Sequence, residues 1–183
     1  MNRRFLFVAA SAFLFSWNAL AAEISPYSGQ EAREIKALSE VEIDGLLAGR
    51  GLGYAKAAEL NGYPGPRHVL ELGDELGLSA DQRALTESAF LRMQTQAREL
   101  GAKLVEAERV LDEIFKNQTV TEDSLKESLV KIAQLNAQVR EAHLQAHLVQ
   151  TRILSLEQVA EYMRLRGYGE GGHGGHTHDH GGG

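Results

Sequence analysis

The chain contains no cysteine among its 183 residues. This absence excludes a disulfide framework, a cysteine nucleophile, a cysteine-ligated zinc site and an iron–sulfur cluster. A formal net charge of −6 argues against a general nucleic-acid binder, because such proteins need clustered lysine and arginine against phosphate. With 24% charged and 43% hydrophobic residues, the chain is neither a disordered acidic polypeptide nor a membrane bundle.

Proline is scarce, and its three positions, Pro26, Pro64 and Pro66, all lie in the first part of the chain. Nothing after Pro66 therefore removes a helical N–H or breaks a long helix. Alternating runs of β-branched and aromatic residues bounded by tight-turn dipeptides are missing as well. The sequence predicts an all-α protein in which small and aliphatic side chains pack helix against helix.

The first 21 residues have the features of a secretory signal peptide. Arg3 and Arg4 form a positive n-region, an apolar run follows from Phe5 to Phe15, and Ala19-Leu20-Ala21 supplies small residues for cleavage. The alternative is a membrane anchor, but the run is shorter than the about 20 apolar residues that a spanning helix needs. We expect a cleaved signal peptide at residues 1–21 and a periplasmic mature protein.

Residues 22–65 predict an N-terminal segment of short helices. Capping boxes, in which a serine hydroxyl and a glutamate three residues later satisfy free helical N–H groups, begin at Ser28 and Ser39. We expect Gly49 to end the helix that follows Ser39. A third short helix is expected from Tyr54 to Leu60.

Residues 66–167 predict a helical domain built on a long antiparallel hairpin. Pro66 suits the first position of a helix that ends at Gly77. A long helix is expected from Ala80 to about Asn117 and a second one after Thr121, and the short linker makes them antiparallel neighbours. Both carry apolar residues at alternating spacings of three and four, as in a heptad seam. The seam positions are Met93, Ala97, Leu100, Leu104, Ala107, Leu111 and Ile114 in the first helix and Ile132, Leu135, Val139, Ala142, Ala146 and Val149 in the second.

One motif occurs twice, each time where a helix is expected to begin. Leu78-Ser79-Ala80-Asp81-Gln82 and Leu154-Ser155-Leu156-Glu157-Gln158 both read L-S-x-x-Q. The pair resembles the two LTxxQ motifs of the Spy/CpxP family of periplasmic proteins, with Ser in place of Thr at both copies. That family shares its fold with a heavy-metal-resistance and metal-sensor branch of the CnrX and ZraP types. The resemblance implies a four-helix cradle over residues 66–167 that pairs into a curved dimer, although compact members lack a segment as long as residues 23–65.

Two histidines, His143 and His147, lie one helical turn apart and could converge on one metal ion. Position 144 is leucine, so this is not the H-E-x-x-H motif of zinc proteases. In the metal-sensor branch, an H-x-x-x-H pair on a corresponding helix helps to bind nickel or cobalt, and His68 with Glu71 could complete such a site here. The alternative is that both histidines are interface residues that hydrogen-bond side chains or carbonyls.

Residues 168–183 consist mainly of glycine and histidine and predict a disordered tail that forms no core. Imidazole groups in such a tract suit Zn²⁺, Ni²⁺ or Cu²⁺, with copper favoured on affinity. The alternative is a soluble tail without function. With Asp179 among them, the histidines are His173, His176, His178 and His180.

The sequence carries no nucleophile elbow, phosphate-binding loop or catalytic carboxylate pair, and we expect a protein that is not an enzyme. The glycine-rich residues 49–53 follow no strand and are interpreted as a helix end and hinge. Two functions remain open. One is a periplasmic metal-stress protein that binds divalent Zn, Ni, Co or Cu through histidine. The other is an ATP-independent holdase that cradles unfolded clients without metal. We expect a homodimer, with unfolded periplasmic clients or a membrane-bound stress regulator as partner and no nucleic acid.

Overall fold

The computed structural model describes residues 24–168, which contain six helices and no strand. The chain divides into two compact units, and all six helices belong to the second, which begins at Ala32. The first unit has turns in its described part, closed by hydrogen bonds such as Ser28 N–H to the Ser25 carbonyl. The signal peptide predicted at 1–21 and all but the first residue of the tail predicted at 168–183 lie outside the described residues. Within residues 24–168, none of the helices has both the length and the apolar character that crossing a membrane requires.

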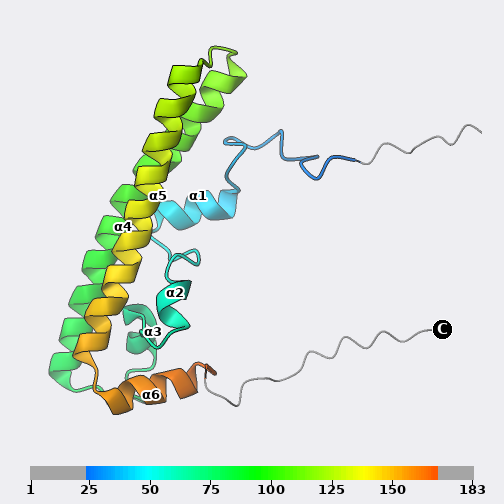
Figure 1. Cartoon of the computed structure of the whole chain (residues 1–183). Helices are drawn as coiled ribbons and strands as arrows, with labels where there is room; N and C mark the ends of the chain where they lie inside the picture. The colour runs from blue at the N-terminus through cyan, green and yellow to red at the C-terminus, as the bar shows by residue number, and fades with distance from the viewer. Residues whose placement is uncertain (1–23, 169–183) are drawn as a thin grey trace, which may run out of the picture. The chain divides into compact units, whose positions relative to one another are not determined.

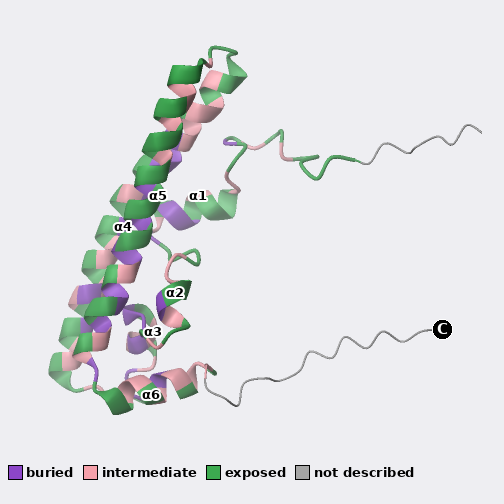
Figure 2. Cartoon of the chain, viewed as in Figure 1, coloured by how far each residue is buried: buried purple, intermediate pink, exposed green. Residues whose placement is uncertain are grey.

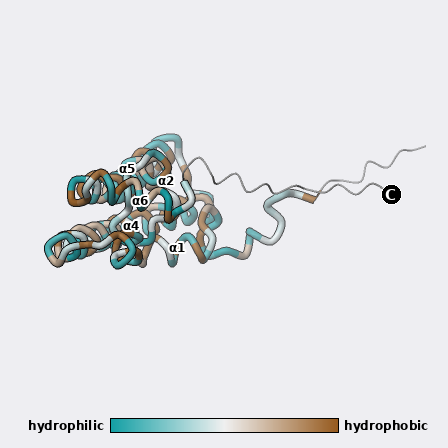
Figure 3. Tube along the Cα trace, turned by 90° about the horizontal axis from the view of Figure 1, so that it is seen from below, coloured by the Kyte–Doolittle hydropathy of each residue, from teal (hydrophilic) through white to brown (hydrophobic). Residues whose placement is uncertain are grey.

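The two longest helices, α4 (Ala80–Lys116) and α5 (Glu122–Ile153), form the predicted hairpin. At 1.5 Å per residue they are about 55 and 48 Å long, and they pack side by side (Figures 1 and 3). The hydroxyl of Thr121 accepts the backbone N–H of Ser124, which caps α5 directly after the short connection at residues 117–121. The all-α fold and the antiparallel hairpin are therefore confirmed.

Four short helices flank this hairpin. α1 (Glu40–Leu47), α2 (Lys56–Glu59) and α3 (Pro66–Glu71) lie on one side of it, and α6 (Leu156–Leu165) lies at its lower end in Figure 1. The same side holds α1 and α2 in the view of Figure 3. The 32–77 segment therefore covers one face of the hairpin.

Local signals set the bounds of these short helices. Ser39 caps α1 in a full capping box, and Gly49 follows the cap residue with a φ of +67°, as predicted. Pro66 is the first residue of α3, also as predicted, but this helix ends at Glu71 and turns continue to Gly77.

Two predictions for the N-terminal part are wrong. No helix follows Ser28, and the chain forms turns and bends up to Leu38. The reason is local, since Gly29 has a φ of +87°, a left-handed conformation that a helix does not use. The helix expected from Tyr54 to Leu60 is only the four residues of α2, because a turn from Gly51 to Tyr54 precedes it.

Two clusters of buried apolar side chains attach the short elements to the hairpin (Figure 2). The first joins the N-terminal segment to the middle of the hairpin, and the second joins α3 and α6 at its lower end. The first contains Ile35, Leu46, Leu104, Val105, Ala107, Leu135 and Val139, and the second contains Val69, Leu76, Leu154 and Tyr162.

The contact between α1 and α4 is close because one residue of α4 has no side chain. A Cβ atom on the buried Gly101 would collide with the backbone carbonyl of Leu46 at the end of α1. Nearby, the Lys36 ammonium lies 3.2 Å from the Asp112 carboxylate, whose Oδ1 also accepts the Lys36 backbone N–H at 3.0 Å. These contacts fix the N-terminal segment to α4.

The heptad seam of α5 is confirmed in its middle and wrong at its end. Leu135, Val139 and Ala146 are buried as predicted, but Val149 is 37% exposed and Gln150 is fully buried instead. The reason is that α2 and α3 pack on this part of α5 from a second side. A helix covered from two sides buries a wider stripe than the a/d positions of a two-helix seam.

Candidate functional site

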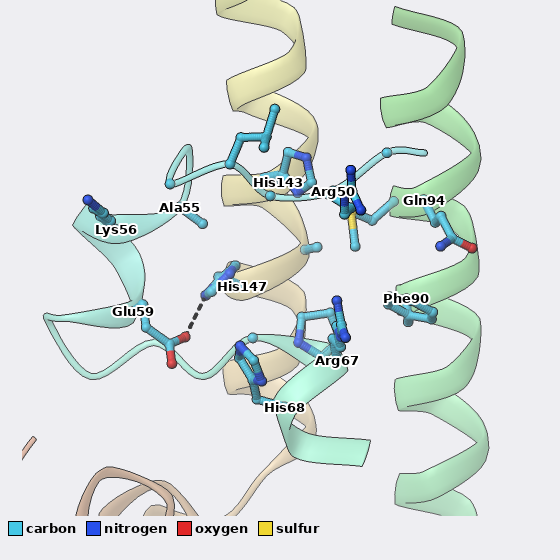
Figure 4. A pocket seen from close by; sticks show the side chains of 18 of the residues that line it. Arg50, Ala55, Lys56, Glu59, Arg67, His68, Phe90, Gln94, His143 and His147 are labelled. Carbon is cyan, nitrogen blue, oxygen red and sulfur yellow. Dashed lines mark ion pairs between the residues drawn. The ribbon is translucent and has the colours of Figure 1, made fainter. Parts of the chain in front are cut away.

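A cavity of about 450 Å³ lies beside α5, and it brings together residues that are far apart in the sequence (Figure 4). Its walls come from α4, α5, the glycine-rich residues 49–53, α2 and α3, and from Arg166 after α6. Along the hairpin it lies between the two buried clusters. Both His143 and His147 line it, and so does His68.

His147 is held in one orientation by a backbone hydrogen bond. Its Nδ1 lies 2.8 Å from the carbonyl oxygen of Tyr63. A carbonyl only accepts, so Nδ1 carries the proton, and in the neutral ring Nε2 keeps its lone pair. Gly65 packs against that side of the ring, where an added Cβ would lie 3.1 Å from Nε2. The neutral ring is therefore held in the tautomer in which Nε2 is the nitrogen that can accept a bond or bind a metal.

His143 is buried by an aromatic ring rather than by polar partners. Its imidazole stacks on Tyr54 with 2° between the ring planes and 6.1 Å between the centroids. Its Nε2 is buried and has no hydrogen-bond partner in the described part of the chain. Burial, and then the neighbouring His147, lower the pKa of His143 below its ordinary value. The ring is thus kept neutral.

Glu59 supplies a carboxylate beside this pair, with 13% of its side chain exposed. Its Oε1 accepts a hydrogen bond of 2.6 Å from the hydroxyl of Tyr162 and lies 3.4 Å from Nε of Arg166. Its Oε2 has no hydrogen-bond partner among residues 24–168, and lies 3.8 Å from Nδ1 of His147. Burial, and then the bond to Glu59, raise the pKa of Tyr162 far above its usual range. Tyr162 therefore remains a hydrogen-bond donor to Glu59.

His68 lines the same cavity from α3, but its side chain is hydrogen-bonded to Glu71. Its Nδ1 lies 2.8 Å from Oε2 of Glu71, and Oε1 of the same carboxylate accepts a 3.0 Å bond from Arg67. These bonds lower the pKa of Glu71, with the hydrogen bond from His68 as the largest cause. The two residues suggested by the sequence as further metal ligands are thus hydrogen-bonded to each other.

The fit of a transition metal to this site rests on two nitrogen atoms. Nowhere in residues 24–168 are three or more His, Asp or Glu side chains grouped so that they could hold one ion. His143 and His147 nevertheless leave a free Nε2 each, four residues apart on one helix. Two imidazole nitrogens suit a transition metal by donor type and supply at most two ligands, so water or other groups would have to complete the coordination. The four tail histidines, His173, His176, His178 and His180, lie outside the described residues.

Both copies of the L-S-x-x-Q motif begin helices, as predicted. Ser79 and Ser155 each accept the backbone N–H of the glutamine three residues later, which gives full capping boxes on α4 and α6. The two glutamines also bond to each other across the end of the hairpin. Nε2 of Gln82 lies 2.8 Å from Oε1 of Gln158, and Nε2 of Gln158 lies 3.1 Å from Oε1 of Gln82.

The leucines of the two motifs lie at the buried cluster at the same end of the hairpin, Leu154 within it and Leu78 packed against it. The leucines pack the starts of α4 and α6 against this cluster. The glutamines join the two helix starts by hydrogen bonds. The motif therefore stabilises the fold of this chain, and its residues do not line the cavity.

Several residues that shape the site carry no signal in the sequence. Glu59 is one glutamate among many, and only the approach of α2 to α6 buries it. Gln150 is buried and donates to the hydroxyl of Thr86, which donates in turn to the backbone carbonyl of Gln82. A polar residue next to a heptad position gives no indication of this bond, because its partner is 64 residues away.

Comparisons with known proteins identify no relative. No protein-family model, no curated protein and no solved structure matches the chain.

Proposed function

We propose that this chain is a metal-binding stress protein that takes a divalent transition metal through His143 and His147. The observation that carries the proposal is the state of the two rings. The Tyr63 carbonyl fixes the His147 tautomer, and Nε2 of His143 is buried without a partner among residues 24–168. Neutral imidazole nitrogen is a good ligand for Zn²⁺, Ni²⁺, Co²⁺ and Cu²⁺. The role is binding rather than catalysis.

The proposal includes a second metal site in the tail. His173, His176, His178 and His180 are donors of the same kind, and the tail follows closely on Arg166, which lines the cavity. We assign the tail a buffering role and the helical pair a fixed site. Either can complete the coordination of the other.

The proposed protein acts in the periplasm. The signal-peptide features of residues 1–21 support export. The paired motifs support a relationship to the Spy/CpxP family, since Ser79 and Ser155 both cap helices and Gln82 and Gln158 are joined. Homodimerisation, and contact with a membrane-bound stress regulator, belong to the same proposal.

A holdase is the second candidate, and one surface favours it. Large apolar side chains are exposed near the end of the hairpin where α4 meets α5: Val110, Phe115, Leu129 and Val130, between 40% and 53% exposed. We call this set the tip surface. It offers unfolded clients an apolar contact that needs no metal. The face of the hairpin covered by α1, α2 and α3 is not free for the same use.

The test of metal binding uses the chain from residue 22 to Gly167, which leaves out the tail histidines. Zn²⁺ and Ni²⁺ are titrated by calorimetry, and the melting temperature is followed by circular dichroism. A ligand that binds only the folded state raises the melting temperature by mass action. We expect a rise that is lost in His143→Gln/His147→Gln.

The matched control is Gln145→Ala, which changes an exposed residue between the two histidines. This variant should keep the full metal-dependent rise. A truncated chain that shows neither binding heat nor a thermal shift would leave the helical pair with a purely structural role.

A further inference from the structure

The cavity beside α5 has a positive charge that the rest of the chain does not share. Four basic residues line it, against the single acidic residue Glu59: Arg50, Lys56, Arg67 and Arg166. The whole chain has a formal charge of −6. A basic cavity in an acidic protein is a specific local arrangement rather than a consequence of composition.

Two of the four cations are neutralised by neighbours and two are not. Arg67 is bonded to Glu71 at 3.0 Å, and Arg166 lies 3.4 Å from Glu59. Arg50 and Lys56 form no ion pair with any residue in the described part of the chain. In Figure 4 Arg50 lies near Gln94 on the α4 side, and Lys56 lies at the start of α2 on the opposite side; both residues are exposed at the edge of the cavity.

The remaining lining is largely apolar. Leu52, Phe90, Met93 and Ala146 contribute side chains, and the phenyl ring and the thioether are only half-buried although they lie within the folded unit. The 450 Å³ of the cavity is within the range of small-molecule sites, which combine an apolar lining with a few placed polar groups. Among those polar groups is the buried Nε2 of His143, which has no partner within residues 24–168.

We propose that this cavity binds a small organic anion. Its carboxylate, sulfonate or phosphate group is attracted by the positive charges of Arg50 and Lys56 at the edge of the cavity, and its apolar body lies against Phe90 and Met93. The inference goes beyond metal binding and does not depend on it, because the two cations and the apolar lining belong to the chain itself. A metal held by His143 and His147 would add a further positive charge to the same cavity.

The test uses two fluorescent probes with the same aromatic rings. Anilinonaphthalene sulfonate carries an anionic group, and N-phenylnaphthylamine has none. Both are titrated against the full mature chain in the presence of a chelator, so that metal has no part in the result. We expect saturable binding of the sulfonate at one site per chain, much tighter than that of the neutral probe.

Two sets of variants separate the charge from the apolar lining. Arg50→Gln/Lys56→Gln should weaken the sulfonate by about tenfold or more and leave the neutral probe unchanged, because only the charge-assisted contacts are lost. Phe90→Ala should weaken both probes. Circular dichroism checks that each variant is folded; Lys56→Gln alone replaces the charge variant if it is not folded, and Phe90→Leu replaces Phe90→Ala.

The matched control is Lys126→Gln/Lys131→Gln, which removes two exposed cations of α5 far along the hairpin from the cavity. It should leave both probes unaffected. Equal affinity for the two probes, or a sulfonate affinity that Arg50→Gln/Lys56→Gln does not change, would overturn the inference. Loss of metal binding in the histidine variants would bear on the metal proposal alone, since the probe titrations contain no metal.

Discussion

The side-chain amides of Gln82 and Gln158 leave no donor or acceptor unused. Besides the two bonds between them, Nε2 of Gln82 donates to the carbonyl of Ile153 and Nε2 of Gln158 donates to that of Leu76. Each Oε1 also accepts the backbone N–H of the serine that caps its own helix. The two L-S-x-x-Q motifs thus make one hydrogen-bonded unit out of two local caps.

Replacing either glutamine should therefore destabilise the fold by more than the loss of a cap. Gln158→Ala leaves the Leu76 carbonyl and both polar atoms of Gln82 short of partners, and we expect a loss of about 1–3 kcal/mol in urea unfolding. Gln82→Ala/Gln158→Ala should cost less than the sum of the two single changes, since the residues share one interaction. Strict additivity would contradict the pairing, and the exposed Gln138→Ala serves as control.

The helix caps of this arrangement can be predicted from the sequence, but the hydrogen bonds between the two motifs cannot. A serine three residues before a glutamine predicts a cap, because all the atoms involved lie within one helical turn. The bond between Gln82 and Gln158 joins positions 76 residues apart, and no short pattern encodes such a contact. The same motif type also misled at Ser28, where Gly29 adopts a left-handed conformation in place of a helix.

The candidate site shows the same division. The spacing of His143 and His147 predicts a shared helical face, and both do line one cavity. The cavity itself could not be predicted, because its other walls come from irregular chain at residues 49–53 and from short helices. Glu59, which lines the cavity, accepts a hydrogen bond from Tyr162, although 103 residues separate them. Because α5 is covered on two sides, Gln150 is buried in place of the predicted Val149. A periodicity derived from two packed helices does not predict this.

The close contact of α1 with α4 predicts whether Gly101→Ala raises or lowers the free energy of unfolding. Alanine stabilises an exposed helix position relative to glycine by about 1 kcal/mol. At Gly101 we expect the reverse, a loss of about 1–3 kcal/mol, because the new methyl group meets the Leu46 carbonyl. Urea unfolding of Gly101→Ala measures it. The exposed neighbour Ala102 gives the control, where Ala102→Gly should show only the propensity effect. A stabilised Gly101→Ala would mean that α1 does not lie against α4.

The lowered pKa of His143 gives stability a dependence on pH. The unfolded chain binds a proton at this residue near pH 6.5, whereas the buried folded ring binds it only at lower pH. Its contribution is therefore complete above about pH 6.5 and is lost as the pH falls through the folded pKa. Urea midpoints measured with a chelator should fall between pH 7.5 and 5.0, and fall less in His143→Phe, which keeps an aromatic ring against Tyr54. Identical slopes for the two proteins would show that His143 is not buried in neutral form.

The two proposed metal sites should separate on truncation. Removing residues 168–183 takes away four histidines, and we expect it to remove most of the bound Zn²⁺ or Cu²⁺ in equilibrium dialysis. We expect the loss of these histidines to leave any metal-dependent rise in melting temperature in place, because that rise requires a site held by the folded helices. Binding should weaken in both proteins as the pH falls, because neutral imidazole is the ligand. Unchanged metal content after truncation would argue against the tail site.

The tip surface should contribute to the proposed homodimer. Phe115 is 53% exposed and Leu129 50% exposed, and pairing of two chains would remove both from water. We expect light scattering to report a dimer at micromolar concentration and Phe115→Ser/Leu129→Ser to shift it toward monomer. Leu156→Ser, an exposed leucine at the other end of the hairpin, should leave the mass unchanged. A monomeric mature chain would count against the dimer and against a shared client surface.

The joined glutamines lie at the open end of the hairpin, opposite the connection at residues 117–121. The second buried cluster and these two amides together hold α6 at this end. Detachment of α6 withdraws Tyr162 from Glu59 and Arg166 from the cavity wall. For the proposed anion, we expect that weakening the two amide hydrogen bonds speeds both entry into the cavity and escape from it.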